Sequence, residues 1–268
     1  MEVKVLRPAE LSDWLISQGR HFASTDEIAE LVDVDPADVR HSLRRQRELN
    51  TIVPVTKGAW VPVPPQYRRN GAPPVDHFID PLMQFLGHLY YVGFLSAAQI
   101  HGASHQAPMV FQVVTDGVLR ARSIGSHRVA FVQRSNVARR ATIRRIVPTG
   151  RINVSTPEVT VLDLVEAPQF GAGLSNVATV IAELLDTGQL DPIGLAEQAA
   201  GYPTAVAQRT GHLVEQMGIE ASAPIDLQPL HDLVENAQTV DLYPGAEQSG
   251  ERNERWNVVA NIAIEPDL

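Results

Sequence analysis

Four arginines and a histidine cluster in one short stretch of the chain, within the sequence DPADVRHSLRRQREL at residues 35–49. A guanidinium group presents its hydrogen-bond donors in a rigid fork that matches phosphate oxygens and the edges of bases. Lysine supplies a compact positive charge that is suited to phosphate. We therefore expect contacts with nucleic acid from Arg40, His41, Arg44, Arg45 and Arg47, and from Lys57 a short distance further along.

The spacing within residues 35–49 predicts a helix with one buried and one free face. Asp35 is expected to cap it, and Pro36 falls at its first position, where a missing N–H costs nothing. At 100° per residue one face collects the residues to be buried, and the arginines lie on or beside the opposite face. The buried set is Val39, Ser42, Leu43, Gln46 and Leu49.

The neighbouring segments predict how this helix is held. Residues 9–18 and 24–34 have helical spacing of apolar residues, and Ser24 with Glu27 forms the pattern of a reciprocal capping box. Residues 51–64 hold two apolar runs around Lys57 and Gly58, which indicates a hairpin, although Pro54 and Pro62 favour edge strands. Three helices followed by a hairpin predict a winged helix-turn-helix over residues 1–68.

A winged helix of this kind is expected to place its third helix in the major groove of DNA. Ser24 and Thr25 would then offer the start of the second helix to a phosphate. Two alternatives stay open, because arginines on a free helix face also serve simple solvation, and winged helices also dock other proteins.

The net charge of −9 hides an uneven distribution. Residues 71–151 carry nine Arg and three acidic residues, whereas residues 152–268 carry three Arg and eighteen acidic residues. All nine Arg lie within residues 117–151. Either DNA phosphate or the acidic segment could neutralise them. We favour a second DNA-facing surface that includes Arg139, Arg140, Arg144 and Arg145, and the sequence does not exclude the alternative.

Beyond a Pro- and Gly-containing linker at residues 69–80, residues 81–268 predict a mixed α/β C-terminal domain with a central sheet, so that the fold class is α+β. Strands are expected at residues 109–115, 128–133, 141–147, 151–155 and 256–264, and helices at 81–89, 95–102, 174–188, 191–201 and 203–218. A further helix is expected to begin at Ser155 as its cap, with Glu158 completing a capping box.

Composition excludes several classes of chemistry. The absence of Cys rules out disulfides and thiolate chemistry, and no apolar run is long enough to span a bilayer. We expect a cytoplasmic protein that contacts no membrane. His101 and His105 have a spacing found in metal sites, but Gly102 should end the helix between them. No lysine follows Lys57, which argues against a nuclease, so that no catalytic residue, metal or cofactor is expected.

Four short motifs stand out in the C-terminal part of the sequence: Leu95-Ser96-Ala97-Ala98 through His101-Gly102, His105-Gln106, Phe111-Gln112-Val113-Val114-Thr115, and Ser155-Thr156-Pro157-Glu158. With them the chain resembles the AbiEi family, which comprises antitoxins and transcriptional regulators of type IV toxin–antitoxin systems. The resemblance covers nearly the whole chain. It implies a repressor that binds inverted repeats in double-stranded DNA at its own operator, as a homodimer or cooperatively, and that counters a nucleotidyltransferase-like toxin. Direct contact with the toxin is left open.

Two other functions are compatible with the sequence. One is a winged-helix transcription factor whose C-terminal domain senses a ligand, which an effector-dependent change in DNA affinity would reveal. The other is a DNA-processing enzyme with a winged-helix module, although the chain has no Gly-rich phosphate loop of the G-x-x-x-x-G-K type.

Overall fold

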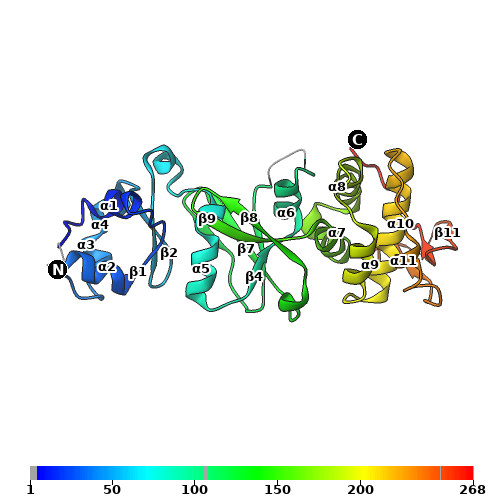
Figure 1. Ribbon diagram of the computed structural model, residues 1–268, viewed down its shortest axis with the longest axis horizontal. Coiled ribbons are helices and arrows are strands. Elements are labelled where there is room, and N and C mark those ends of the chain that lie inside the picture. The colour runs from blue at the N-terminus through cyan, green and yellow to red at the C-terminus, as the bar shows by residue number, and fades with distance from the viewer. Residues whose placement is uncertain (1–4, 105–107, 248, 268) are drawn as a thin grey trace. The chain divides into compact units, whose positions relative to one another are not determined.

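Helices and strands are interspersed along the chain in a mixed α+β fold (Figure 1). The structure, a computed structural model, describes residues 5–104, 108–247 and 249–267. They form two compact units. The first unit takes in the described residues of 1–91, 109–137 and 144–153, and the second takes in those of 92–108, 138–143 and 154–268. The boundaries at residues 68 and 80 stay a prediction.

The first unit begins with four short helices and a small sheet. The helices are α1 (Leu11–Ser17), α2 (Thr25–Val32), α3 (Val39–Ser42) and α4 (Arg44–Glu48). The strands are β1 (Ala23–Ser24), β2 (Ile52–Thr56) and β3 (Ala59–Pro62), in the order β1-β3-β2. Leu11, Leu15, Ile28, Leu43 and Trp60 belong to one buried cluster that joins helices and sheet. Burial of these apolar side chains is the main force that stabilises the arrangement.

The start of α2 forms as the sequence predicts. Ser24 Oγ accepts a hydrogen bond from the backbone N–H of Glu27 at 3.1 Å, and the Ser24 N–H donates to Glu27 Oε2 at 2.7 Å. This reciprocal pair gives hydrogen-bond acceptors to two backbone N–H groups at the start of the helix, those of Ser24 and Glu27. The helix stops at Asp33, whose φ of 54° lies in the left-handed region.

The single helix expected over residues 35–49 is wrong in two respects. Residues 36–38 form a turn, because Asp35 Oδ1 accepts a hydrogen bond from the Ala37 N–H at 2.8 Å and the helix begins only at Val39. Aspartate side chains often divert the backbone in this way. The helix is also interrupted at Leu43, whose φ of −89° and ψ of 7° lie outside the α-helical region.

The predicted hairpin is present, but the expectation that both prolines lie on edge strands is wrong. Strand β3, with Pro62 at its end, is the central strand. Proline is tolerated there because β1 pairs only with Trp60 and Ala59 and does not reach Pro62. The pairing of β2 with β3 shifts register between Pro54 and Thr56, so that Val55 has no partner in the ladder.

Short helices lead from this region to the larger sheet. They are η1 (Pro65–Asn70), η2 (Val75–His77) and α5 (Ile79–Leu86). The six-stranded sheet has the order β6-β7-β5-β4-β9-β8. Its strands are β4 (Tyr90–Val92), β5 (Phe111–Thr115), β6 (Arg122–Ile124), β7 (His127–Gln133), β8 (Thr142–Val147) and β9 (Gly150–Ser155), with η3 (Val137–Arg139) before β8. The sequence predicts four of these strands, and β4 and β6 were missed.

In the second unit the helices pack around α7 (Pro157–Glu166), which contacts α6 (Phe94–His101), α8 (Leu174–Asp186), α9 (Pro192–Ala199) and α10 (Thr204–Glu220). All residues from Glu158 to Val165 are buried. Between and after these helices lie η4 (Pro168–Gly171), α11 (Gln228–His231) and the short strands β10 (Val240–Asp241), β11 (Arg252–Asn253) and β12 (Val258–Val259). The strand expected over residues 256–264 is therefore reduced to two residues.

The cap of α7 differs from the prediction by one residue. Thr156 is the N-cap, and its Oγ1 accepts from the Val159 N–H. Ser155 Oγ lies 2.7 Å from Thr160 Oγ1 instead, and Glu158 Oε1 accepts from the Asp191 N–H at 3.0 Å. The two residues therefore connect α7 to its surroundings and do not form a capping box.

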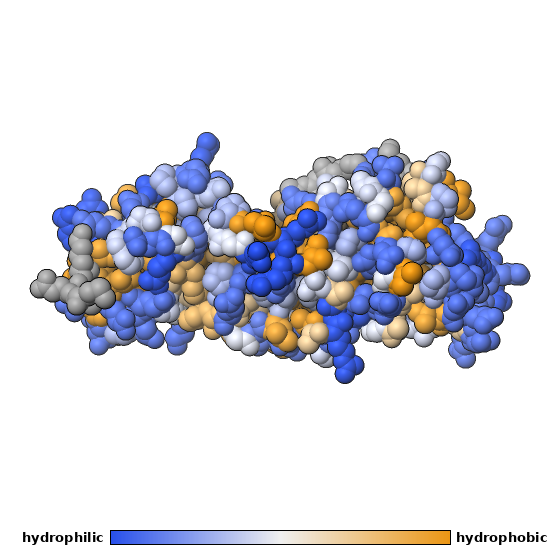
Figure 2. Space-filling view, viewed as in Figure 1, coloured by the Kyte–Doolittle hydropathy of each residue, from blue (hydrophilic) through white to orange (hydrophobic). Residues whose placement is uncertain are grey.

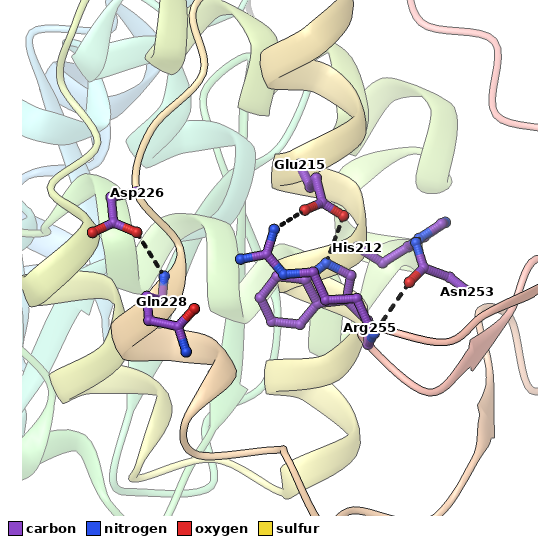
Figure 3. A network of polar contacts seen from close by, with 7 residues as sticks. His212, Glu215, Asp226, Gln228, Asn253 and Arg255 are labelled. Carbon is purple, nitrogen blue, oxygen red and sulfur yellow. Dashed lines mark hydrogen bonds and ion pairs between the residues drawn. The ribbon is translucent and has the colours of Figure 1, made fainter.

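A polar network fixes the end of the second unit to α10 (Figure 3). Glu215 forms an ion pair with Arg255, and its Oε2 accepts from Trp256 Nε1 at 2.8 Å. His212 Nδ1 lies 3.2 Å from Asn253 Nδ2. Because an amide nitrogen only donates, this contact requires an unprotonated Nδ1. Burial lowers the pKa of His212, and the charge of Glu215 opposes this effect only in part.

Replacing His212 by Gln should weaken the dependence of stability on pH. Below the ordinary histidine pKa of 6.5 the unfolded chain binds a proton that the folded chain resists, so that stability is full above this pH and falls as the pH decreases. Urea unfolding at pH 7 and pH 5 measures the difference. His41→Gln, which removes an exposed imidazole, is the matched control. An equally steep loss in wild type and His212→Gln would contradict this account.

Candidate nucleic-acid interface

The helix pair α3–α4 presents positive side chains on its outer surface. Arg40, His41, Arg44 and Arg45 are exposed, and Arg47 is half-buried. Val39 and Leu43 are fully buried on the other side, as predicted. Leu49 is 57% exposed, which corrects the expectation that it is buried, because α4 ends before it at Glu48.

The charge of this surface is largely uncompensated. Arg44 Nε lies 3.0 Å from Glu48 Oε1, in an exposed pair that adds little to stability. In the part of the chain that the structure describes, no carboxylate lies within ion-pair distance of Arg40, Arg45 or Arg47. These guanidinium groups are therefore available to an external anion.

Ser24 and Thr25, which the sequence suggests as phosphate contacts, are occupied by other interactions. Ser24 belongs to the capping box described above, and Thr25 Oγ1 accepts from Trp60 Nε1 at 2.9 Å. The Thr25 N–H donates to the Gly58 carbonyl at 2.8 Å. Asp26 and Glu27 also place negative charge in the first turn of α2, which opposes a phosphate there.

A groove of about 750 Å³ lies between α3, the β2–β3 turn and β6, and we call it the α3–wing groove. It brings together Thr25, Arg40 and Lys57, three residues that the sequence suggests as a site. Its lining residues are Thr25, Pro36, Arg40, Pro54, Val55, Thr56, Lys57, Gly58, Trp60, Arg122 and Ser123. The groove thus combines three positive side chains with an apolar wall.

Arg122 is the member of this groove that sequence reasoning missed. Its Nη1 donates to the Val55 carbonyl at 3.0 Å, and its guanidinium carbon lies 5.7 Å from the centre of the Phe131 ring. The side chain is half-buried, and burial lowers the pKa of the guanidinium. The sequence marks Arg122 only as one of nine arginines, because its role depends on β6 lying beside β2.

The four arginines suggested for a second DNA surface have different environments. Arg144 and Arg145 are exposed on β8, at the edge of the sheet opposite to β6, and belong to the first unit. Arg139 is exposed and belongs to the second unit. Arg140 is only 9% exposed, and its guanidinium carbon lies 3.3 Å from the centre of the Tyr202 ring.

The position of Arg140 removes it from any surface that could reach DNA. Tyr202, on which it stacks, donates through its hydroxyl to Asp163 Oδ1 at 2.9 Å. Asp163 is 1% exposed. A cation over an aromatic face and a buried hydrogen-bonded carboxylate stabilise the second unit. Arg140 therefore contributes to the packing of the second unit and not to a DNA surface.

His101, the first histidine of the pair considered as metal ligands, is also buried within the fold. His101 is 6% exposed, and its Nε2 lies 2.8 Å from the Ser155 carbonyl oxygen. Gly102, with φ of 81°, ends α6 as predicted. His105 and Gln106 lie outside the described residues. Among the described side chains no group of three His, Asp or Glu is arranged to hold a metal ion.

Hydrophilic residues cover most of the face of the molecule that Figure 2 shows. In Figure 2 the apolar residues of the face in view form small, separate patches. The helices that the structure describes are too short or too polar to cross a bilayer.

Comparison with known proteins identifies part of the chain. Residues 91–216 match the family model described as AbiEi antitoxin C-terminal domain, which confirms the resemblance found in the sequence. The crystal structure of the RV2827C protein from Mycobacterium tuberculosis is similar, with a TM-score of 0.67 and 15% sequence identity, over 96% of this chain and 92% of that chain. At this identity the likeness concerns the fold alone. No curated protein matches the chain.

Arg140 and its neighbour Arg139 should differ in their effect on stability. Arg140→Gln loses the stacking on Tyr202 and should lower the free energy of unfolding by about 1–2 kcal/mol, since the cation is desolvated. Arg139→Gln removes the same charge from an exposed position and is the matched control. Thermal unfolding of the full chain measures both. If the two variants unfolded at the same temperature, the structural role of Arg140 would be refuted.

Proposed function

We propose that the chain is an antitoxin that also represses its own operon, on the premise that residues 91–216 match the AbiEi antitoxin C-terminal domain. Residues 1–68 act in this proposal as a winged helix-turn-helix that binds double-stranded DNA. Repression needs no catalytic residue, because it requires only that the protein occupy the operator.

One observation carries the DNA-binding proposal. Exposed arginines without carboxylate partners lie on α3 and α4, and Lys57 lies at the turn of the adjacent hairpin. The order of α1, α2 and the helix pair α3–α4 followed by a hairpin supports insertion of α3–α4 into the major groove, with Lys57 on the DNA backbone. Arg40, Arg44, Arg45 and Arg47 then contact base edges or phosphates, and His41 lies beside them.

The interruption at Leu43 limits which arginines can enter the major groove on one continuous helix face. A continuous recognition helix would present Arg40, Arg44 and Arg47 along one line, since residues three and four apart share a face. With α3 and α4 separated, Arg40 belongs to one short helix and Arg44, Arg45 and Arg47 belong to the other. We propose that Arg40 contacts DNA together with Lys57, whose side chain lines the same groove.

Two further parts of the proposal extend from the family. The operator contains inverted repeats, which two copies of the chain bind as a homodimer or cooperatively, because a two-fold symmetric site calls for two recognition helices. The toxin is a nucleotidyltransferase-like protein, and direct contact with it is not needed for the proposal.

Arg144 and Arg145 are exposed on β8, and in this proposal they form a second DNA contact. The buried Arg140 is left out of this contact, and Ser24 and Thr25 have no part in the interface.

Replacing Arg40 and Arg44 together by Ala should weaken binding to a duplex from the region upstream of the gene by about ten- to a hundred-fold, as expected for lost base or phosphate contacts. Both side chains are exposed, so the melting temperature should stay nearly unchanged. Fluorescence anisotropy at constant salt measures the affinity. Arg7→Ala with Arg69→Ala removes the same charge from exposed positions outside the helix pair and is the control.

The same variants separate repression from protection in cells. The Arg40, Arg44 double variant should lose repression of a reporter behind the upstream region while still protecting cells that express the neighbouring toxin gene. If the duplex bound the double variant as tightly as the control, the placement of α3–α4 in the groove of DNA would be wrong.

A further inference from the structure

The α3–wing groove has the size of a small-molecule site. Its volume of about 750 Å³ falls within the range of ordinary ligand pockets, roughly 300–1,000 Å³. Its positive side chains come from three separate elements, with Arg40 on α3, Lys57 on the β2–β3 turn and Arg122 on β6. Positive side chains on three separate elements can surround a small ligand, whereas a row of positive side chains along one helix faces an extended surface.

Arg122 gives this groove a fixed and partly buried positive charge. One of its N–H groups is held by the carbonyl of Val55, the residue that the register shift leaves without a ladder partner. This contact orients the guanidinium. Among the described residues none supplies a carboxylate to Arg122, Arg40 or Lys57.

A half-buried cation without a counterion is unfavourable, and an anion in the groove would relieve this cost. Burial already lowers the pKa of Arg122, which reports the same unfavourable desolvation. A phosphate with two negative charges can accept hydrogen bonds from several cationic groups at once. The three positive side chains therefore match a terminal phosphate better than a single carboxylate.

The wall of the groove indicates what is attached to the phosphate. Pro36, Pro54, Val55 and Trp60 supply apolar lining, and the Trp60 Nε1 group is already bonded to Thr25. Apolar surface contributes little to a hydrated phosphodiester backbone, which binds through charge. It contributes to the binding of a base or another apolar group that is shielded from water.

We propose that the α3–wing groove binds a small phosphorylated molecule, with its phosphate among Arg40, Lys57 and Arg122 and its apolar part against Pro54, Val55 and Trp60. Arg40 and Lys57 also belong to the DNA surface of the proposed function. Ligand and DNA therefore exclude one another, and this second statement rests on the proposed function. Binding of the small molecule to the groove does not.

Isothermal titration of the full chain with adenosine 5′-monophosphate tests the site, with inorganic phosphate and adenosine as comparisons. Saturable binding of one nucleotide per chain is expected. Inorganic phosphate should compete with it, and adenosine should bind at least ten-fold more weakly. Arg122→Gln and Lys57→Gln should each weaken nucleotide binding at least ten-fold. Arg128→Gln, an exposed arginine on β7 opposite Ser123, should leave it unchanged.

The outcomes separate this inference from the proposed function. Absence of saturable nucleotide binding, or equal binding by wild type and the Lys57→Gln variant, overturns the ligand site. The exposed Lys57 decides this even if Arg122→Gln disturbs folding. If the nucleotide does not bind but Arg122→Gln weakens duplex binding, a DNA phosphate occupies the groove, and the ligand inference fails while the proposed function stands. Nucleotide binding without any duplex binding supports the site and overturns the proposed function.

Discussion

Positive charges that share one groove repel one another, and the α3–wing groove holds Arg40, Lys57 and Arg122 without a carboxylate from any described residue. The chain as a whole has a net charge of −9, so acidic side chains are plentiful elsewhere. Because these acidic side chains lie away from the groove, an external anion can neutralise its positive charge. The hydrogen bond from Arg122 to the Val55 carbonyl joins β6 to the hairpin and places the Arg122 guanidinium at the groove.

Arginine has a second use in this protein, as a packing residue. Arg140 stacks on Tyr202, which donates to the buried Asp163 on α7, the helix around which the second unit is built. This chain of contacts joins the segment before β8 to the centre of the helical unit. Buried and exposed charged residues of a sequence cluster therefore have to be distinguished before the cluster is assigned to a binding partner. Arg144 and Arg145 lie only a few positions away from Arg140 and are exposed.

Some local patterns in the sequence predicted local structure correctly. Ser24 and Glu27 form the expected capping box, Val39 and Leu43 are buried, and the hairpin turns at Lys57 and Gly58. Features that depend on distant segments were missed. Strand β6 is three residues long, and Arg122 acquires its role only because β6 lies beside β2. The break at Leu43 was missed because helical periodicity continues across it. The family could be recognised from motifs, whereas the groove could not.

Hydrogen–deuterium exchange of the full chain, with and without a duplex from the region upstream of its gene, tests the DNA-binding surface most directly. Slower exchange of the backbone amides on DNA binding is predicted at residues 36–47 and 53–60, because a bound duplex covers α3, α4 and the hairpin. Slower exchange at residues 142–147 would add β8 to the surface. If the duplex bound and slowed exchange only within residues 157–220, the assignment of DNA binding to the N-terminal residues would be contradicted.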